Sequence, residues 1–398
     1  MCRSRVFAMA MTPFDFRVPS LLLFGAGKAA ELPGLVRRHG TRCLLVTGRA
    51  SLWASGALGA IAGGLEGAGI AVSAAEVAGE PTPELVDSIA ARRRGEEIAC
   101  VVAVGGGSVL DAGKAVAAML VHEGSVGDFL EGVGTRPFDG RRLPFIAVPT
   151  TAGTGSEAAR NAVISRVGPG GFKRSLRHDA LMPDAAVVDP ELHRSCPPPL
   201  TAACGMDAVT QLLESYVSLK ANPLTDALAE AGLAAAGRAL PAAYADGTDL
   251  EARSRMAYAA YCSGITLTNA GLGVVHGFAS SVGGRFSIPH GALCGTLAGP
   301  CLRATVERLK EGGEVRHLAK IARAGRHLTG REGRDLGADL DGLLGLLDEW
   351  ARALCLPRLG EFGVTEADLP GLAAATGCKD NPVVLSPGDL ETILKERL

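Results

Sequence analysis

The first half of the chain alternates short apolar runs with stretches that have helical spacing. Five apolar runs are predicted to be β-strands, and they lie at residues 42–48, 69–77, 100–107, 144–151 and 185–190. The stretches "SGALGAIAGGLEGAG" and "TPELVDSIAARRRG" between them are predicted to be helices, the second with Thr82 as its N-cap. Because strands that alternate with helices pair in parallel, this half is predicted to be a Rossmann-like parallel sheet with helices on both faces.

The second half has a different pattern, in which β-branched runs become rare. Helical spacing is found at residues 200–219, 223–241, 249–268, 291–311 and 315–328. A Gly- and Asp-rich stretch at 330–345 is predicted to be a loop between two C-terminal helices. The prolines of "CPPPL" at 196–200 mark a hinge, so we predict an α/β domain at 1–197 and an all-helical domain at 198–398.

Composition excludes several classes of function. The 398 residues carry a formal net charge of −2 with scattered basic residues, which indicates no nucleic-acid or membrane surface. The longest apolar run of the first half, "IACVVAV", is too short to span a bilayer, and the N-terminus lacks the apolar core of a signal peptide. Ten cysteines without a C-x-x-C pair favour a reducing compartment, so we expect a cytoplasmic protein.

Two loops rich in small residues follow predicted strands. "VVAVGGGSVLDAGKA" places three glycines and a serine before a helix, where free N–H groups and close backbone approach form a phosphate cradle. "VPTTAGTGSE", at 148–157, adds hydroxyl groups after a second strand. Each loop alone is also compatible with a tight turn, but together they fit ligand binding at the carboxyl edge of a parallel sheet.

The end of the first predicted strand, "VTGRAS", bears on the choice of nucleotide. A carboxylate here would bind a ribose 2′-hydroxyl and select NAD, but Gly48 offers none. Arg49 and Ser51 could instead accommodate a 2′-phosphate. The sequence therefore favours NADP over NAD.

A second group of residues suggests a metal site. "GLGVVHGFASSVGGRFSIPHG" holds His276 and His290 in an apolar setting, where each alone is compatible with a satisfied core histidine. In "GMDAVTQLLESYVS", Asp207 and Gln211 are four residues apart and share one helix face. One carboxylate and two imidazoles suit a divalent ion with an open coordination position. The histidines at 39, 122, 178, 193, 317 and 327 are predicted to be surface or loop residues.

These motifs, with "MPDAAVVDPEL", follow one another in the order found in a known family. From about residue 14 to 310, the chain resembles the iron-containing (group III) alcohol dehydrogenases. The resemblance implies a dehydroquinate synthase-like fold, with an N-terminal nicotinamide-cofactor domain and a helical metal-binding domain. It implies reversible hydride transfer between NAD(P)H and a small aldehyde or ketone, and a homodimer or larger assembly.

Site residues are carried over position by position. The resemblance assigns pyrophosphate binding to Gly106, Gly107 and Ser108. It assigns the rest of the cofactor groove to Thr150, Thr151 and Thr154, with Lys173 near the ribose. It assigns the metal, Fe²⁺ foremost with Zn²⁺ or Mn²⁺ as alternatives, to Asp207, Gln211, His276 and His290.

The chain departs from the family pattern at two positions. Gln211 stands where the family usually has histidine, so it either ligates weakly through its carbonyl oxygen or holds a water beside the metal. Ser280 stands where the family often has a histidine near the substrate. Ser280 is therefore expected to pass a proton only through water.

Three other readings remain open at the level of sequence. The first is a metal-independent keto-acid reductase that resembles the maleylacetate reductases. The second is a lyase that resembles dehydroquinate synthase and shows no net cofactor turnover. The third is a degenerate homologue that only binds nucleotide.

Overall fold

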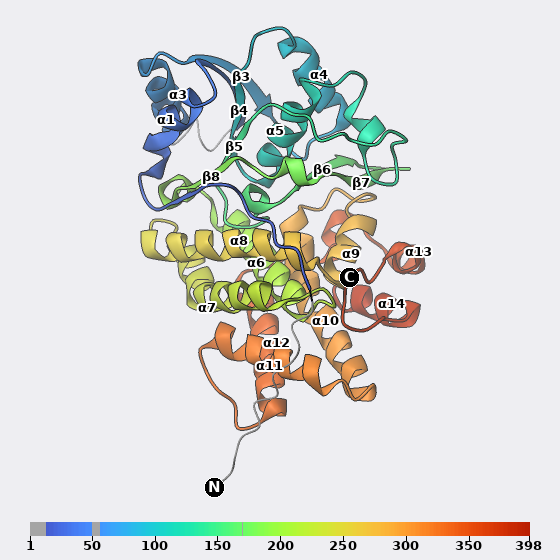
Figure 1. Ribbon diagram of the computed structural model, residues 1–398. Coiled ribbons are helices and arrows are strands. Elements are labelled where there is room, and N and C mark those ends of the chain that lie inside the picture. The colour runs from blue at the N-terminus through green and yellow to red at the C-terminus, as the bar shows by residue number, and fades with distance from the viewer. Residues whose placement is uncertain (1–12, 50–55, 169) are drawn as a thin grey trace.

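The computed structural model describes residues 13–49, 56–168 and 170–398. A sheet with its helices forms one half of the molecule, and a cluster of helices forms the other (Figure 1). The sheet half is built from the N-terminal part of the chain, and from α6 onward the elements of the described residues are helical. No helix among the described residues is both long enough and apolar enough to cross a membrane.

Six parallel strands form the sheet, in the order β1-β8-β5-β4-β2-β3. The strands are β1 (Leu22–Phe24), β2 (Arg42–Gly48), β3 (Ala71–Val77), β4 (Cys100–Gly105), β5 (Phe145–Pro149) and β8 (Ala185–Val188). The five predicted strands are thus confirmed to within two residues at each end. The edge strand β1 was not predicted, because three residues are too few to show a period.

Helices cover both faces of the sheet, as predicted. Side chains of α1 (Leu32–Arg37) and α3 (Ala57–Gly67) pack on one face, and those of α4 (Pro83–Arg93) and α5 (Gly107–Met119) pack on the other. Thr82 caps α4 by accepting a hydrogen bond from the backbone N–H of Leu85. After β2, the next strand β3 pairs on one side of β2, and the following strand β4 pairs on the other side of β2, so the direction of strand addition reverses here. Ligands bind at such a switch point in open α/β sheets.

A β-hairpin after β5 was not predicted. It pairs β6 (Asn161–Arg166) with β7 (Phe172–Arg177) in antiparallel register. Charged and small residues interrupt its apolar alternation, so its sequence has a weak strand signal. The hairpin contacts both α5 and α9 (Val274–Ser281), and it therefore joins the two halves of the molecule.

The helical half surrounds α6, which is buried along most of its length. Its helices are α6 (Pro198–Val217), α7 (Pro223–Ala245), α8 (Leu250–Ala270), α9, α10 (His290–Glu311), α11 (Val315–Thr329), α12 (Leu336–Ala353), α13 (Leu369–Ala375) and α14 (Pro387–Glu396). The five predicted helices are confirmed. The loop predicted at 330–345 is wrong beyond Asp335, whose side chain caps α12, because Leu340, Leu343 and Leu347 on one face of α12 are buried in the core.

Candidate metal centre and cofactor cleft

One face of α6 carries three polar residues, Asp207, Gln211 and Glu214. Their spacing of four and seven residues places them one above another on the helix. All three side chains are buried, Asp207 to 1% exposure. A buried polar group is costly without a partner, so each of them must be satisfied by a neighbouring element or by a ligand.

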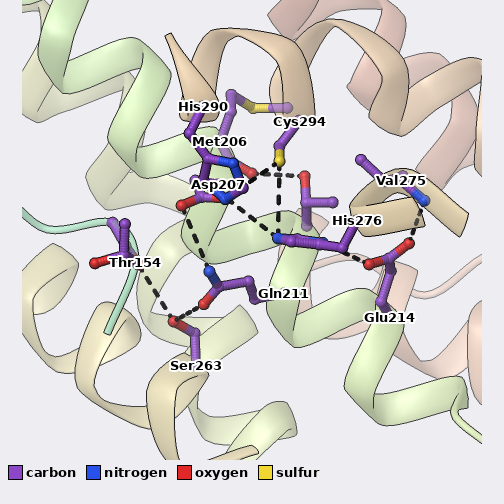
Figure 2. Close-up of polar contacts among 12 residues, drawn as sticks. Thr154, Met206, Asp207, Gln211, Glu214, Ser263, Val275, His276, His290 and Cys294 are labelled. Carbon is purple, nitrogen blue, oxygen red and sulfur yellow. Dashed lines mark hydrogen bonds and ion pairs between the residues drawn. The ribbon is translucent and has the colours of Figure 1, made fainter. Parts of the chain in front are cut away.

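Two histidines from neighbouring helices converge on Asp207, as Figure 2 shows. His276 lies in α9, and His290 is the first residue of α10. Their Nε2 atoms lie 3.5 Å and 3.6 Å from Oδ1 of Asp207. That oxygen is buried and has no hydrogen-bond donor among the described residues. A carboxylate oxygen in this position fits a bound cation.

Cys294 joins this group and was missed by sequence reasoning. Its Sγ lies 3.7 Å from Nε2 of His276 and 3.8 Å from Nε2 of His290. One potential ligand atom from each of Asp207, His276, His290 and Cys294 lies within 4.8 Å of the others. The available signal was the spacing of four residues between His290 and Cys294 at the start of a predicted helix.

Glu214, also missed, fixes the orientation of His276. One carboxylate oxygen accepts a hydrogen bond from Nδ1 of His276 at 2.7 Å, and the other accepts one from the backbone N–H of Val275 at 2.6 Å. The opposite ring nitrogen, Nε2, therefore faces Asp207 (Figure 2). This carboxylate–histidine pair is the usual support of a metal-binding imidazole.

Gln211 connects Asp207 to α8. Its Nε2 donates to Oδ2 of Asp207 at 3.4 Å, and its Oε1 accepts from the hydroxyl of Ser263 at 2.9 Å. Both ends of the amide are thus engaged with protein groups (Figure 2). The amide restrains the second oxygen of Asp207 and leaves Oδ1 to face the histidines.

The protonation states suit a divalent cation. Burial would raise the pKa of Asp207, but the nearby His290 and His276 outweigh it and hold that pKa below its ordinary value. Burial lowers the pKa of His290 to about 4, so its imidazole is neutral. Burial also disfavours charge on His276, but attraction by Cys294 and Glu214 raises its pKa well above the ordinary value. Asp207 is therefore ionised and His290 is neutral, which are the states in which these two groups can bind a metal.

The two predicted cofactor loops pack directly against each other. A Cβ on Gly107 would lie 2.5 Å from Oγ1 of Thr154, and one on Gly106 would lie 3.3 Å from Oγ1 of Thr151. The backbone N–H of Thr150 donates to the carbonyl of Gly105 at 2.9 Å. Gly106 is the N-cap of α5, so the free N–H groups of that helix begin at this contact. Glycine is required here because the neighbouring loop fills the space of a side chain.

A single cleft connects these loops with the histidines. Gly107, Ser108 and Thr154 line it from the sheet half, and Gln211, His276 and His290 line it from the helical half. The cleft therefore presents backbone and hydroxyl groups of the sheet half and the two imidazoles of the helical half to the same space.

The remaining predicted site residues lie in different places. Lys173 and Ser280 line the same cleft; Lys173 is ion-paired with Glu80, and the Ser280 hydroxyl donates to the carbonyl of His276 at 3.2 Å. Gly48 ends β2, and the exposed Arg49 after it lies 3.6 Å from the carboxylate of Glu76. Ser51 lies outside the described residues.

Two histidines predicted to be at the surface or in loops are in fact buried, and neither lies in the metal cluster. His122 contacts Asp139 through Nε2 at 2.8 Å, and His193 contacts the carbonyl of Pro149 at 3.1 Å. Burial lowers the pKa of His193 to about 4, so it serves as a neutral hydrogen-bonding group of the core. His122 lies in a loop, as predicted, although neighbouring elements cover it, whereas the prediction is wrong for His193, which is buried in a short 3-10 helix.

Known proteins resemble this chain over nearly its whole length. Residues 19–190 match the family described as iron-containing alcohol dehydrogenase, and residues 201–398 match the C-terminal part of the Fe-containing alcohol dehydrogenase family. Long-chain-alcohol dehydrogenase 1 of Geobacillus thermodenitrificans is 39% identical over 274 residues, 69% of each chain. Alcohol dehydrogenase 4 of Schizosaccharomyces pombe is 34% identical over 396 residues, covering 98% of this chain and 90% of that protein. The crystal structure of a 1,3-propanediol oxidoreductase superposes with a TM-score of 0.87 at 30% identity, covering 97% of this chain and all of that one.

Proposed function

Because the chain belongs to the iron-containing alcohol dehydrogenase family, we propose that it transfers hydride reversibly between NADP(H) and a small aldehyde or ketone at a divalent metal. The chain is an oxidoreductase of the alcohol dehydrogenase type. The observation that carries the proposal is the single cleft from the N-terminus of α5 to Gln211, His276 and His290, with Asp207 buried directly behind the two imidazoles. That cleft could hold a nicotinamide and a carbonyl group side by side.

In this proposal Asp207, His276 and His290 hold the metal, and Gln211 holds Asp207. A bound divalent ion supplies Lewis-acid polarisation of the substrate oxygen. The residues of the chain supply geometry: Glu214 turns His276, and Gln211 restrains Oδ2 of Asp207. The unpartnered Oδ1 and the neutral His290 support this ligand set.

The nicotinamide cofactor is proposed to bind along the carboxyl edge of the sheet. Gly106, Gly107 and Ser108 would hold the pyrophosphate at the N-terminus of α5, where free N–H groups and the helix dipole favour an anion. Thr150, Thr151 and Thr154 would line the next part of the groove, with Lys173 beside the ribose.

Gly48, Arg49 and Ser51 are proposed to select NADP(H) over NAD(H). The contact between Arg49 and Glu76 joins two exposed side chains, and such a pair is weak enough to be exchanged for a phosphate. The matching prediction is that Arg49→Ala raises KM for NADPH more than KM for NADH. An equal change for both cofactors would contradict this role of Arg49.

Ser280 is proposed to relay the proton of the alcohol. Its hydroxyl lines the cleft and donates to a carbonyl of its own helix. Because a serine hydroxyl is not an acid near neutral pH, it can act only by passing a proton between waters.

The relatives are named alcohol dehydrogenases, which does not favour the metal-independent keto-acid reductase.

Two further proposals concern the protein in the cell. Nine cysteines in the described part of the chain are unpaired, which supports a reducing compartment such as the cytoplasm. We also propose a homodimer, which light scattering of the purified protein would test.

The proposed activity is tested by following NADPH and NADH oxidation with aldehydes of increasing chain length. Relatives are named for propanediol and for long-chain alcohols, so the series should include both. His276→Ala should lose bound metal and turnover, whereas the matched control His39→Ala, which changes an exposed histidine far from the cleft, should lose neither. Full turnover in His276→Ala would refute the proposal.

A further inference from the structure

We propose that Cys294 is the fourth protein ligand of the metal and that its thiolate shifts the preference of the site from Fe²⁺ toward Zn²⁺. The inference rests on the proposed function, because it concerns the same site. In this ligand set, a sulfur from α10 takes the role of the imidazole that the family usually has at position 211, on α6.

Four of the six distances among the potential ligand atoms match a tetrahedral zinc site. With zinc bonded to nitrogen at about 2.0–2.1 Å and to oxygen at about 2.0–2.2 Å, tetrahedral angles place an oxygen and a nitrogen ligand about 3.4 Å apart. A sulfur at about 2.3 Å from zinc lies about 3.6 Å from each nitrogen. The observed distances are 3.5 Å and 3.6 Å from Oδ1 of Asp207 to the two imidazoles, and 3.7 Å and 3.8 Å from Sγ of Cys294 to the same atoms.

The surroundings of Cys294 give a second, independent reason. Oδ1 of Asp207 is buried without a hydrogen-bond donor and belongs to the same cluster as the sulfur. The carbonyl oxygen of Gln211, the alternative fourth donor, already accepts from Ser263. Figure 2 shows the sulfur pointing toward both imidazoles, on the side of the cluster away from Gln211. The thiol can therefore complete the ligand set while Gln211 keeps its hydrogen bonds, and only the contacts of Sγ with the two imidazoles would be exchanged for bonds to the metal.

Sulfur in the ligand set changes which metal binds best. On binding, the metal would take the place of the thiol proton, which leaves to solvent, and a metal–thiolate bond would form. Thiolate is a soft donor. A site that contains it favours Zn²⁺ over harder divalent ions more strongly than a site built from carboxylate and imidazole alone. Four protein ligands oblige a substrate oxygen to enter as a fifth, so turnover alone does not report on the sulfur.

Cobalt(II) is the probe that reports the sulfur directly. Metal-free full-length protein is loaded with one equivalent of Co²⁺, and thiolate ligation gives an intense sulfur-to-cobalt charge-transfer band in the near ultraviolet. We compare the wild type with Cys294→Ser and with Cys301→Ser. Cys301 is an ideal control because it is also a buried cysteine of α10, seven residues further along, and lies outside the metal cluster.

The expected result is a charge-transfer band in the wild type and in Cys301→Ser that is lost in Cys294→Ser. Competition between Zn²⁺ and Fe²⁺ should also show the zinc preference falling about tenfold or more in Cys294→Ser. Cobalt bound to the wild type without the band would overturn the inference and leave the proposed function intact. No bound cobalt, together with turnover that survives chelation, would instead refute both.

Discussion

At the scale of single residues, the site divides into groups visible in the sequence and groups that only packing reveals. Asp207, His276 and His290 could be predicted as a group because a carboxylate and two imidazoles are unusual in apolar, small-residue segments. The role of Glu214 could not, because it depends on the orientation of the His276 ring, and the spacing of Cys294 from His290 does not show that α10 presents the sulfur to α9. Spacing along one helix says nothing about the direction in which a neighbouring helix presents its side chains.

The role of Glu214 leads to a prediction about metal affinity. In Glu214→Gln, the amide can still accept from Nδ1 of His276, but its NH₂ group must then face the backbone N–H of Val275, which is also a donor. We expect the affinity for Zn²⁺ to fall about 10–100-fold, as it does when such supporting groups are removed. Competition with a chromogenic chelator measures this change.

Glu66→Gln is the matched control, because Glu66 is exposed on α3 and far from the site. It should leave the affinity for Zn²⁺ unchanged. Equal affinity in Glu214→Gln and the wild type would show that the carboxylate does not orient His276.

At the scale of elements, the two glycine-rich loops could be placed from the sequence, but their mutual contact could not. Each loop follows a strand with a clear apolar run, and parallel pairing brings their ends to one edge. The contact between Gly107 and Thr154 depends on the path of the chain after β5. The sequence has no periodic pattern there that would predict this path. The β6–β7 hairpin escaped prediction for the same reason, whereas the Gly- and Asp-rich composition of 330–345 concealed the helical spacing of Leu340, Leu343 and Leu347 in α12.

The contact between these loops predicts opposite effects for two glycine substitutions. A methyl group in Gly107→Ala would overlap Thr154, so we expect a loss of about 1–3 kcal/mol of stability and a higher KM for the cofactor. Gly63→Ala, in the exposed interior of α3 with no heavy atom within 4 Å of the new methyl, should instead gain about 0.5–1 kcal/mol. Urea unfolding and cofactor kinetics measure both, and a harmless Gly107→Ala would contradict the close packing.

A buried lysine on α5 predicts how stability depends on pH. Lys114 donates to Ser156 at 2.8 Å and to the carbonyls of Ala159 and Asn161 at 2.9 Å, and Asp111 and Glu157 lie nearby. Burial lowers its pKa from 10.5 to about 8. Between these values the unfolded chain binds the proton and the folded chain does not, so this group makes stability rise with pH.

Comparison with Lys114→Met isolates this effect from other titrating groups. The unfolding free energy of the wild type, minus that of Lys114→Met, should rise by about 2 kcal/mol from pH 8 to pH 10. Urea unfolding at several pH values measures the difference. A difference that stays flat or falls would mean that Lys114 keeps its proton in the folded state.

At the scale of the whole molecule, the proposed function depends on the contact between the two halves. The sheet half presents the N-terminus of α5, the helical half presents the histidines, and a single cleft brings them together. The alternation of strands and helices, followed by helices alone, was sufficient to predict this architecture. Its division at residue 197 remains a prediction. The depth and width of the cleft depend on side chains from both halves and could not be predicted.

The most direct test of the account is the metal content of the protein alongside its turnover. Protein purified without chelators is analysed by mass spectrometry for metals, and NADPH oxidation is followed before EDTA, after EDTA and after metal is returned. We predict close to one divalent metal per chain, loss of turnover on chelation and recovery with added Zn²⁺ or Fe²⁺. Protein without bound metal whose turnover is unchanged by EDTA would contradict the account and leave Asp207 as a structural residue of α6.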